Sequence, residues 1–309
     1  MTPTQNGMIA ECQRASAEPR GRRDTALARR GSDYAGRLTA AVRDERPRYR
    51  CFGVESDIAA GVRGTLMTGV EEDRNHWSRV AEEWMVWARA PNHDAFWAYR
   101  ASLAAFIGGG GGEALDVGCG EGRVSRELRA LGYQVTATDP VSDLVKATAL
   151  AKSAHYYAVA GATKLPFGDG CFDLVVAYNV LMDVEDVPAA LREIRRVMRP
   201  TGRIILSIVH PIADHGRFSN METNSPFVLQ GTYFGRQRFE GVEERDGLRM
   251  HFAGWAHPLE AYAAALEGAG LAITSIREPL PDLGDGRDHM RRWTRFPLFL
   301  WLEAHPRTC

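Results

Sequence analysis

The sequence predicts an α/β fold, in which a mostly parallel sheet is covered by helices on both faces. Short apolar or β-branched runs alternate with helical patterns through most of residues 113–304, and such alternation is typical of βαβ units. A glycine-rich turn with Gly118, Gly120 and Gly122 follows the first run, and an acid, Asp139, ends the second. Neighbouring strand ends of this kind are where open α/β sheets bind nucleotide-like ligands.

The composition indicates a protein without a strong electrostatic bias. The 309-residue chain has 38 lysines and arginines against 39 aspartates and glutamates, a net charge of −1. No global field therefore favours nucleic acid or an anionic membrane. No apolar run approaches the ~18 residues of a membrane span, and the N-terminus lacks the apolar core of a signal peptide. We expect neither a nucleic acid nor a membrane as partner, and the sequence carries no information on oligomeric state.

The cysteines favour a reducing compartment. There are five, an odd number with no C-x-x-C pair: Cys12, Cys51, Cys119, Cys171 and Cys309. This usage argues against a disulfide framework or a zinc site, so we expect a cytoplasmic protein without a metal.

Residues 1–70 differ from the rest of the chain. They hold many arginines, no lysine and few large apolar side chains. Such a segment cannot bury enough surface to offset its chain entropy, so we expect a disordered tail. Acids interrupt the basic stretch around residues 20–30, which favours a solvated tail over a nucleic-acid contact. An alternative is that the natural protein starts later, for instance at Met67.

Residues 71–110 are expected to form a helical lid. Apolar and aromatic side chains recur every three or four residues through 73–90, which predicts an amphipathic helix. Asn92 or Asp94 can cap a second helix, which the glycines at 108–112 end. Aromatic stripes of this kind belong to a hydrophobic core as often as to a ligand site. Packing in the core is therefore an equal alternative to a lid over the cofactor.

Residues 111–210 are the predicted cofactor-binding core. The stretch 113–128 combines a short strand, a glycine-rich turn and the start of a helix, and Asp116 begins the pattern D-x-G-x-G-x-G. Glycine tolerates positive φ, and the missing Cβ lets a ligand lie against the main chain. In the dinucleotide fingerprint G-x-G-x-x-G the third glycine comes one residue later. The spacing therefore counts against a nicotinamide or flavin dinucleotide.

Three further motifs follow in order: Leu165-Pro-Phe167, Phe172-Asp-Leu-Val175 and Arg199-Pro-Thr-Gly-Arg203. With them, the chain resembles the class I, S-adenosylmethionine-dependent methyltransferases over roughly residues 73–305, and more narrowly their small-molecule, "type 11"-like branch. The resemblance implies a Rossmann-like sheet of seven strands in the order 3-2-1-4-5-7-6, with the seventh antiparallel to its neighbours. It also implies S-adenosyl-L-methionine as the cofactor and a small-molecule methyl acceptor as the partner.

The remaining segments fit that order. The core is completed by helices at 141–154 and 187–198 and by strands at 134–138, 155–160, 172–177 and 203–209. Residues 211–256 interrupt the alternation with charged and glycine-rich turns, and a long irregular connection is usually functional. We interpret them as an insertion that shapes the substrate side. Residues 257–309 complete the sheet, with a helix at 257–269 and strands at 271–277 and 298–304.

The resemblance assigns cofactor contacts to the glycine-rich turn. The backbone at Gly118, Cys119, Gly120 and Gly122 is expected to approach the methionine and ribose parts of the cofactor. Asp116 is expected to brace the turn or to touch the amino group.

Further contacts are expected at the next strand ends. Asp139 can accept hydrogen bonds from both ribose hydroxyls, with Pro140 on the adenine side. The family's usual acid after the third strand is replaced here by Gly161, so the backbone at Gly161 or Ala162 must serve instead. Tyr178, just past the fourth strand, is expected beside the sulfonium or the methionine carboxylate.

A general base is needed only if the acceptor loses a proton as it reacts. His210 is the first candidate, because it leaves the fifth strand at the carboxyl edge of the sheet. The equal alternative is that it merely starts the following turn. Asp183, His215 and His257 are weaker candidates, and His76 has no assignable role.

Three functions fit these observations. The first is a methyltransferase acting on oxygen, nitrogen or an aromatic carbon of a small molecule, such as a secondary metabolite. The second is an RNA or protein methyltransferase, which the lack of an Asn-Pro-Pro-Tyr signature disfavours, since Tyr-Asn-Val-Leu stands at 178–181. The third is an S-adenosylmethionine-binding protein without transferase activity.

Overall fold

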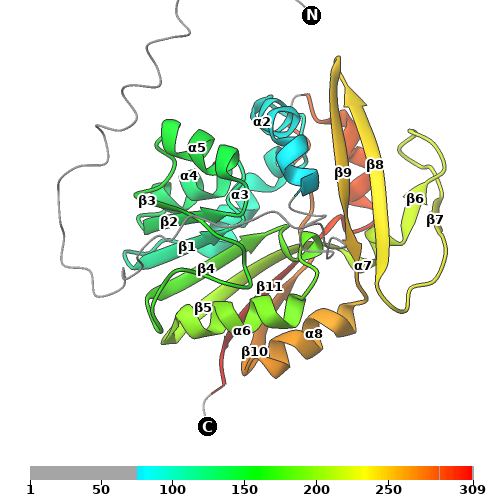
Figure 1. The fold of residues 1–309 in the computed structure, drawn as a ribbon. Helices are drawn as coiled ribbons and strands as arrows, with labels where there is room; N and C mark the ends of the chain where they lie inside the picture. The colour runs from blue at the N-terminus through cyan, green and yellow to red at the C-terminus, as the bar shows by residue number, and fades with distance from the viewer. Residues whose placement is uncertain (1–74, 285, 308–309) are drawn as a thin grey trace, which may run out of the picture. The chain divides into compact units, whose positions relative to one another are not determined.

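The computed structural model describes residues 75–284 and 286–307 (Figure 1). The expected tail at 1–70, the alternative start at Met67 and three of the cysteines, Cys12, Cys51 and Cys309, lie outside these residues.

A seven-stranded sheet forms the centre of the described region (Figure 1). Its strands are β1 (Glu113–Val117), β2 (Gln134–Asp139), β3 (Tyr156–Val159), β4 (Phe172–Tyr178), β5 (Met198–Val209), β10 (Leu271–Arg277) and β11 (Phe299–Pro306). The order is β3-β2-β1-β4-β5-β11-β10. Strands β1 to β5 are parallel, and β11 runs antiparallel to both β5 and β10. The predicted fold class and strand order 3-2-1-4-5-7-6 are therefore confirmed.

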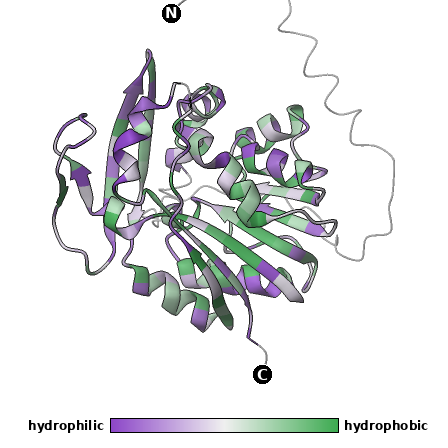
Figure 2. Ribbon diagram, turned by 180° about the vertical axis from the view of Figure 1, so that it is seen from behind, coloured by the Kyte–Doolittle hydropathy of each residue, from purple (hydrophilic) through white to green (hydrophobic). Residues whose placement is uncertain are grey.

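Helices cover both faces of this sheet (Figure 1). One face carries α3 (Phe96–Ile107), α4 (Arg123–Ala130) and α5 (Ser142–Leu150), and the other carries α6 (Val187–Val197) and α8 (Leu259–Gly268). Successive side chains of a strand point to opposite faces, so each strand contributes side chains to the hydrophobic core on each face of the sheet. In β4, Val175 packs in the core that includes α6 and α8, and Val176 packs in the core that includes α3 and α4. Apolar residues accordingly dominate the central strands in Figure 2.

The predicted lid forms two helical pieces. Residues 75–79 are helical, the chain bends at Val80, and α2 (Ala81–Arg89) follows. The single helix expected at 73–90 is therefore broken within the described residues. At the start of α3, Asp94 Oδ1 accepts a hydrogen bond from the Phe96 amide at 2.8 Å, so Asp94 and not Asn92 serves this helix end.

The insertion forms two small antiparallel pairs. A short helix, α7 (Pro211–Asp214), leads to β6 (Gly216–Phe218) and β7 (Phe227–Leu229), and then to β8 (Gln237–Arg245) and β9 (Leu248–Ala256). Asp246 and Gly247 join β8 to β9, and both have positive φ, 49° and 77°, as a tight hairpin turn of the I′ type requires. Strand β9 packs against α2, where Phe252 makes edge contacts with the rings of Trp84 and Trp87.

Several element bounds differ from the predictions, and α5 ends at Leu150, four residues before the expected end. Strand β5 begins at Met198, five residues before the expected start, and it continues through Gly202. A Cβ on Gly202 would lie 2.9 Å from the carbonyl oxygen of Phe172 on β4, so a close backbone approach requires the glycine. A 3₁₀ helix, η2 (Asp288–Thr294), lies between the last two strands and was not predicted. None of the helices in the described ranges is both long and apolar enough to cross a membrane.

Candidate functional site

A cavity of about 650 Å³ lies at the carboxyl ends of the parallel strands. Its size falls within the roughly 300–1,000 Å³ of small-molecule sites. Residues directly after β1, β2 and β4 line it, and so do the lid tryptophans Trp77, Trp84 and Trp87. Side chains of the insertion and of η2 complete its wall. Three aromatic rings of the predicted lid therefore lie at this cavity.

The glycine-rich turn forms part of the cavity floor. Gly118 and Gly120 have φ values of 67° and 55°, which L side chains rarely adopt. A Cβ on Gly118 would overlap the Val180 side chain, and one on Gly120 would lie 2.9 Å from Trp84 Nε1. Cys119, between them, donates its amide to the Thr138 carbonyl of β2 at 2.8 Å. Sheet pairing therefore fixes the turn, and the two glycines allow Val180 and Trp84 to pack closely against it.

Asp116 and Gly122 lie on the side of the turn that faces away from the cavity, and neither residue lines it. Asp116 is buried, and its Oδ2 accepts a hydrogen bond from Ser125 Oγ at 2.5 Å. Burial raises the pKa of this carboxyl to about 7. Gly122 precedes α4 with a φ of 91°, and a Cβ there would lie 2.6 Å from the Ser153 side chain. The expected bracing role of Asp116 thus matches its contacts, whereas Gly122 serves helix packing.

Asp139 faces the glycine-rich turn across the cavity floor. Its Oδ2 accepts a hydrogen bond from the Gly120 amide at 3.0 Å, and its Oδ1 accepts one from the Val141 amide at 2.9 Å. Burial raises the pKa of Asp139 to about 6, although both amides oppose the shift. The carboxyl is therefore mostly ionised at neutral pH and can accept further hydrogen bonds from a ligand.

The segment after β3 lies along the same cavity. Pro140, Gly161 and Ala162 line it together with Thr163 and Lys164. A Cβ at Gly161 would meet no atom within 4 Å, so the backbone there is accessible to a flat ligand. This placement agrees with the expectation that backbone replaces the missing acid.

Tyr178 lines the cavity beside a buried arginine that sequence reasoning missed. The guanidinium of Arg123 lies 4.7 Å from the ring centroids of Trp84 and Phe96 and 5.7 Å from that of Tyr178. Its Nη1 donates to Asp94 Oδ1 at 2.5 Å. Cation–π contacts and the ion pair offset the cost of burying this charge. The one signal in the sequence was its position, directly after the last glycine of the turn.

His210 does not line the cavity. Its Nδ1 accepts a hydrogen bond from the Ile212 amide at 3.1 Å, which caps α7, and its Nε2 lies 3.0 Å from Glu278 Oε1. Burial lowers the pKa of His210. Both ring nitrogens are thus engaged, and this geometry corresponds to the alternative in which His210 starts the turn. Its role as base stays a prediction without support from its position.

The weaker base candidates are scattered. Asp183 lines the cavity, whereas His76, His215 and His257 do not. His257 is buried, and burial lowers its pKa to about 4. These histidines are therefore not brought together with the cofactor turn.

Asp214, at the end of α7, lines the cavity and was missed by the sequence analysis. Its Oδ2 is buried and has no hydrogen-bond partner among the described residues. Burial raises the pKa of the carboxyl well above its ordinary value. A buried carboxyl oxygen without a hydrogen-bond partner in the described chain is costly, and such groups gather at functional sites. The signal was present in the sequence, because Asp214 follows β5 in the same turn as His210.

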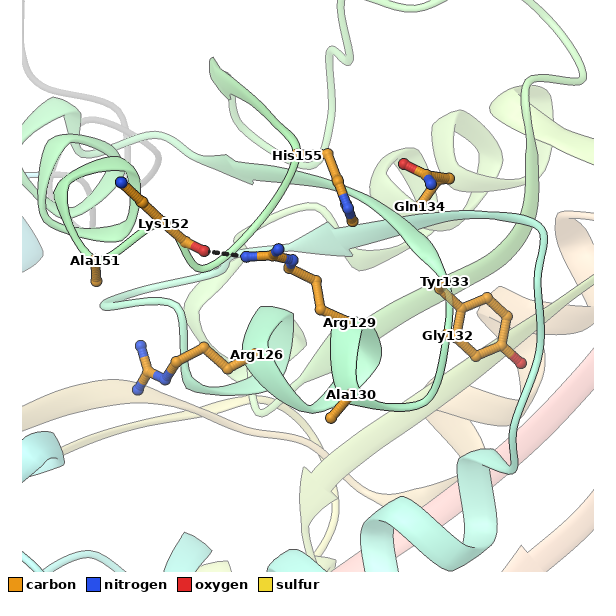
Figure 3. Close-up of a pocket in the computed structure, with 9 residues that line it drawn as sticks. All are labelled: Arg126, Arg129, Ala130, Gly132, Tyr133, Gln134, Ala151, Lys152 and His155. Carbon is orange, nitrogen blue, oxygen red and sulfur yellow. Dashed lines mark hydrogen bonds between the residues drawn. The ribbon is translucent and has the colours of Figure 1, made fainter.

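A second hollow, of about 500 Å³, lies at the opposite edge of the sheet (Figure 3). It is formed around the ends of α4 and α5 and the start of β2, and Arg129 there donates to the Lys152 carbonyl. None of the residues expected to bind the cofactor lines it.

Comparison with known proteins identifies the core. Residues 115–206 match the family model described as "Methyltransferase domain". Over 97 residues the chain is 36% identical to the malonyl-[acyl-carrier protein] O-methyltransferase of Serratia marcescens, which covers 31% of this chain and 38% of that protein. Over 114 residues it is 39% identical to the demethylmenaquinone methyltransferase of Mycobacterium tuberculosis, which covers 37% of this chain and 47% of that protein. The chain thus spans less than half the length of these curated relatives.

The fold is also similar to that of an S-adenosylmethionine-dependent methyltransferase from Mesorhizobium loti. The TM-score is 0.54 at 23% identity, over 68% of this chain and 97% of that one. At this identity the likeness concerns the fold alone. The domain match, the strand order and the glycine-rich turn agree: residues 115–206 are similar to methyltransferase domains, and the sheet has the strand order expected of the class I, S-adenosylmethionine-dependent type.

Proposed function

We propose that the protein is a methyltransferase that transfers the methyl group of S-adenosylmethionine to an oxygen, nitrogen or aromatic carbon of a small molecule. The observation that supports this most directly is the hydrogen bond between Asp139 and the Gly120 amide, at 3.0 Å, on the floor of an aromatic-walled cavity. It joins an acid suited to ribose hydroxyls with a turn suited to close ligand approach.

The chemistry demands positioning above all. S-adenosylmethionine, when bound, supplies a methyl group made electrophilic by its cationic sulfur. Asp139 holds the ribose, the backbone at Gly118 and Gly120 supports the methionine part, and Gly161 lies along the adenine. The rings of the lid exclude water and keep the acceptor close. Orientation of this kind can account for roughly 7–11 kcal/mol of a barrier.

Asp214 is the base where the acceptor must lose a proton. For a hydroxyl or amine acceptor, Asp214 Oδ2 would accept the proton that the acceptor loses when it takes the methyl group. That oxygen is buried at the cavity wall without a partner in the described chain. Burial raises the pKa of Asp214 above its ordinary value, which increases the affinity of the carboxylate for a proton. An aromatic-carbon acceptor would lose its proton in a later step.

The size of the cavity, about 650 Å³, favours a small acceptor over RNA. The relatives named above act on a malonyl group carried by a protein and on demethylmenaquinone, and both names describe compact reacting groups. The walls formed by Trp87, Phe252 and Phe299 provide flat apolar contact for such a group.

The test is incubation with S-adenosylmethionine and a panel of small phenols, indoles, amines and carboxylic acids, with S-adenosylhomocysteine and the methylated product measured by mass spectrometry. Product from a small molecule is the expected result. Turnover on tRNA or protein alone would replace the proposal with the nucleic-acid or protein alternative. Tight cofactor binding with no product from any of these substrates would favour a binding protein.

A further inference from the structure

A half-buried arginine on η2 lacks the acceptor that its charge requires. Arg292 lines the cavity, and its Nε is buried with no hydrogen-bond partner among the described residues. Its Nη1 lies 2.9 Å from Met221 Sδ, and a thioether is only a weak acceptor. Its guanidinium also lies 5.3 Å from the ring centroid of Phe218. In the described chain, no carboxylate lies within 4 Å of it. A guanidinium with unsatisfied donors in a cavity is a site for an anion.

A second arginine, Arg245, adds positive charge to the part of the cavity wall that contains Arg292. Arg245, at the end of β8, donates to the His93 carbonyl and, at 3.1 Å, to His289 Nε2. Burial, and after it the charges of Arg245 and Arg292, lower the pKa of His289 to about 4. His289 is therefore neutral at physiological pH, and its Nε2 accepts a hydrogen bond from Arg245 without adding charge. Arg245, His289 and Arg292 all line the same cavity.

Nearby acids do not neutralise the two arginines directly. Glu243 also lines the cavity from β8, but within the described ranges it forms no ion pair closer than 4 Å with Arg245 or Arg292. Asp246 is 3.5 Å from His93 Nε2, with its side chain largely exposed. Both acids raise the pKa of Arg245 only in part, because burial acts more strongly in the opposite direction.

The surroundings of this wall are flat and apolar. Met290, Trp293, Leu298 and Phe299 come from η2 and the start of β11, and they line the cavity beside Arg292. Trp293 makes edge contacts with Phe218 at a centroid distance of 5.0 Å. A ligand that contacts both the arginines and these apolar side chains would carry an anionic group on a flat apolar body.

We propose that Arg292, supported by Arg245 and His289, binds a carboxylate of the methyl acceptor, whose aromatic body lies against Trp293 and Phe299. This assignment rests on the proposed function, because it names the substrate class of the same cavity. The carboxylate fits the planar fork of arginine better than a neutral group does. The subsite therefore selects aromatic acids over their neutral analogues.

The test is calorimetry on the full chain loaded with S-adenosylhomocysteine, so that no transfer occurs. Binding of S-adenosylhomocysteine itself is measured first and tests the proposed function separately. The probes are hydroxybenzoates and indole carboxylates, each compared with its own carboxamide. We expect at least one acid to bind at least about tenfold more tightly than its carboxamide, the scale of one charge-assisted hydrogen bond. If no acid in the panel binds more tightly than its carboxamide, the proposal is overturned.

Variants then locate the effect. Arg292→Gln is expected to remove the preference for the acid while cofactor affinity is unchanged, and Arg292→Lys is expected to keep part of it. Arg291→Gln is the matched control, since this neighbour on η2 is exposed and pairs with Asp288 at 3.2 Å. An Arg292→Gln protein that keeps the full preference contradicts the assignment. The wild-type comparison of acid and carboxamide needs no variant, so it decides the matter even if Arg292→Gln does not fold.

Discussion

Asp139 at the end of β2 accepts a hydrogen bond from the amide of Gly120, 19 residues earlier in the turn after β1, at 3.0 Å. One carboxylate oxygen thus holds the turn, and the other holds the Val141 amide. The two strand ends that the resemblance assigns to one nucleoside are therefore joined in the protein itself. Disturbing this acid should affect the ligand and the turn together.

Replacement of this acid should weaken cofactor binding. Asp139→Ala removes both oxygens, and we expect a loss of roughly 1–3 kcal/mol in the binding free energy of S-adenosylhomocysteine, the scale of hydrogen bonds to a charged group. Titration calorimetry measures the loss. Asp143→Ala is the control, because that exposed aspartate on α5 pairs only with Lys146 in the described chain. Equal affinities for the Asp139 variant and the wild type would remove Asp139 from the cofactor site.

The buried Asp116 should make stability depend on pH. Its folded pKa of about 7 lies above the ordinary value of 3.8, so the folded state binds the proton more tightly than the unfolded state. The contribution of Asp116 to stability is therefore greatest below pH 4 and falls as pH rises toward 7, by about 1.4 kcal/mol for each unit of pKa difference. Asp116→Asn cannot titrate. The stability of this variant relative to wild type should rise between pH 4 and 7 in urea unfolding, and a flat or falling difference would contradict the assignment.

A side chain on Gly120 should disturb the lid as well as the turn. Gly120→Ala places an L residue at a φ of 55° and a Cβ 2.9 Å from Trp84 Nε1. The backbone strain costs about 1–2 kcal/mol, and displacement of Trp84 should also weaken cofactor binding. Gly170→Ala is a matched control, since Gly170 has a φ of 66° and no atom within 4 Å of its Cβ position. Thermal unfolding should register both changes, and only Gly120→Ala should lower cofactor affinity. A similar affinity loss in both variants would show that Trp84 plays no part.

Variants of the two base candidates, Asp214 and His210, should differ in their effects on turnover and stability. Asp214→Asn is expected to lower turnover by about 10²- to 10⁴-fold, the usual range for a general base, with cofactor affinity unchanged. His210→Gln removes the cap of α7 and should cost about 0.5–2 kcal/mol of stability, with turnover largely kept. Steady-state kinetics and thermal unfolding distinguish these outcomes. Loss of turnover in the His210 variant, with normal activity in the Asp214 variant, would restore His210 as the base.

Much of the fold could be predicted because its signals are local. Strand β10 has the predicted bounds, 271–277, and the strand order is the one that the family resemblance implied. The acid at 139 and the glycines at 118 and 120 lie where the resemblance put them, because neighbouring parallel strands end at the same edge.

The acceptor side could not be predicted in the same way. Strand β8 has the charged sequence QRFEGVEER, which lacks a clean alternation, and it is held by pairing with β9 along its length. Arg292 becomes part of the cavity only because η2 folds back between the last two strands. Asp214 differs from other acids by the burial of one oxygen atom, and no sequence pattern reports the burial of a single atom.

The most direct measurement is a calorimetric titration of S-adenosylhomocysteine into the purified full chain, with nicotinamide and flavin dinucleotides titrated in parallel. The account predicts one site for S-adenosylhomocysteine that Asp139→Ala weakens, and no binding of either dinucleotide. Failure of S-adenosylhomocysteine to bind, or binding of a dinucleotide that Asp139→Ala abolishes, would contradict it.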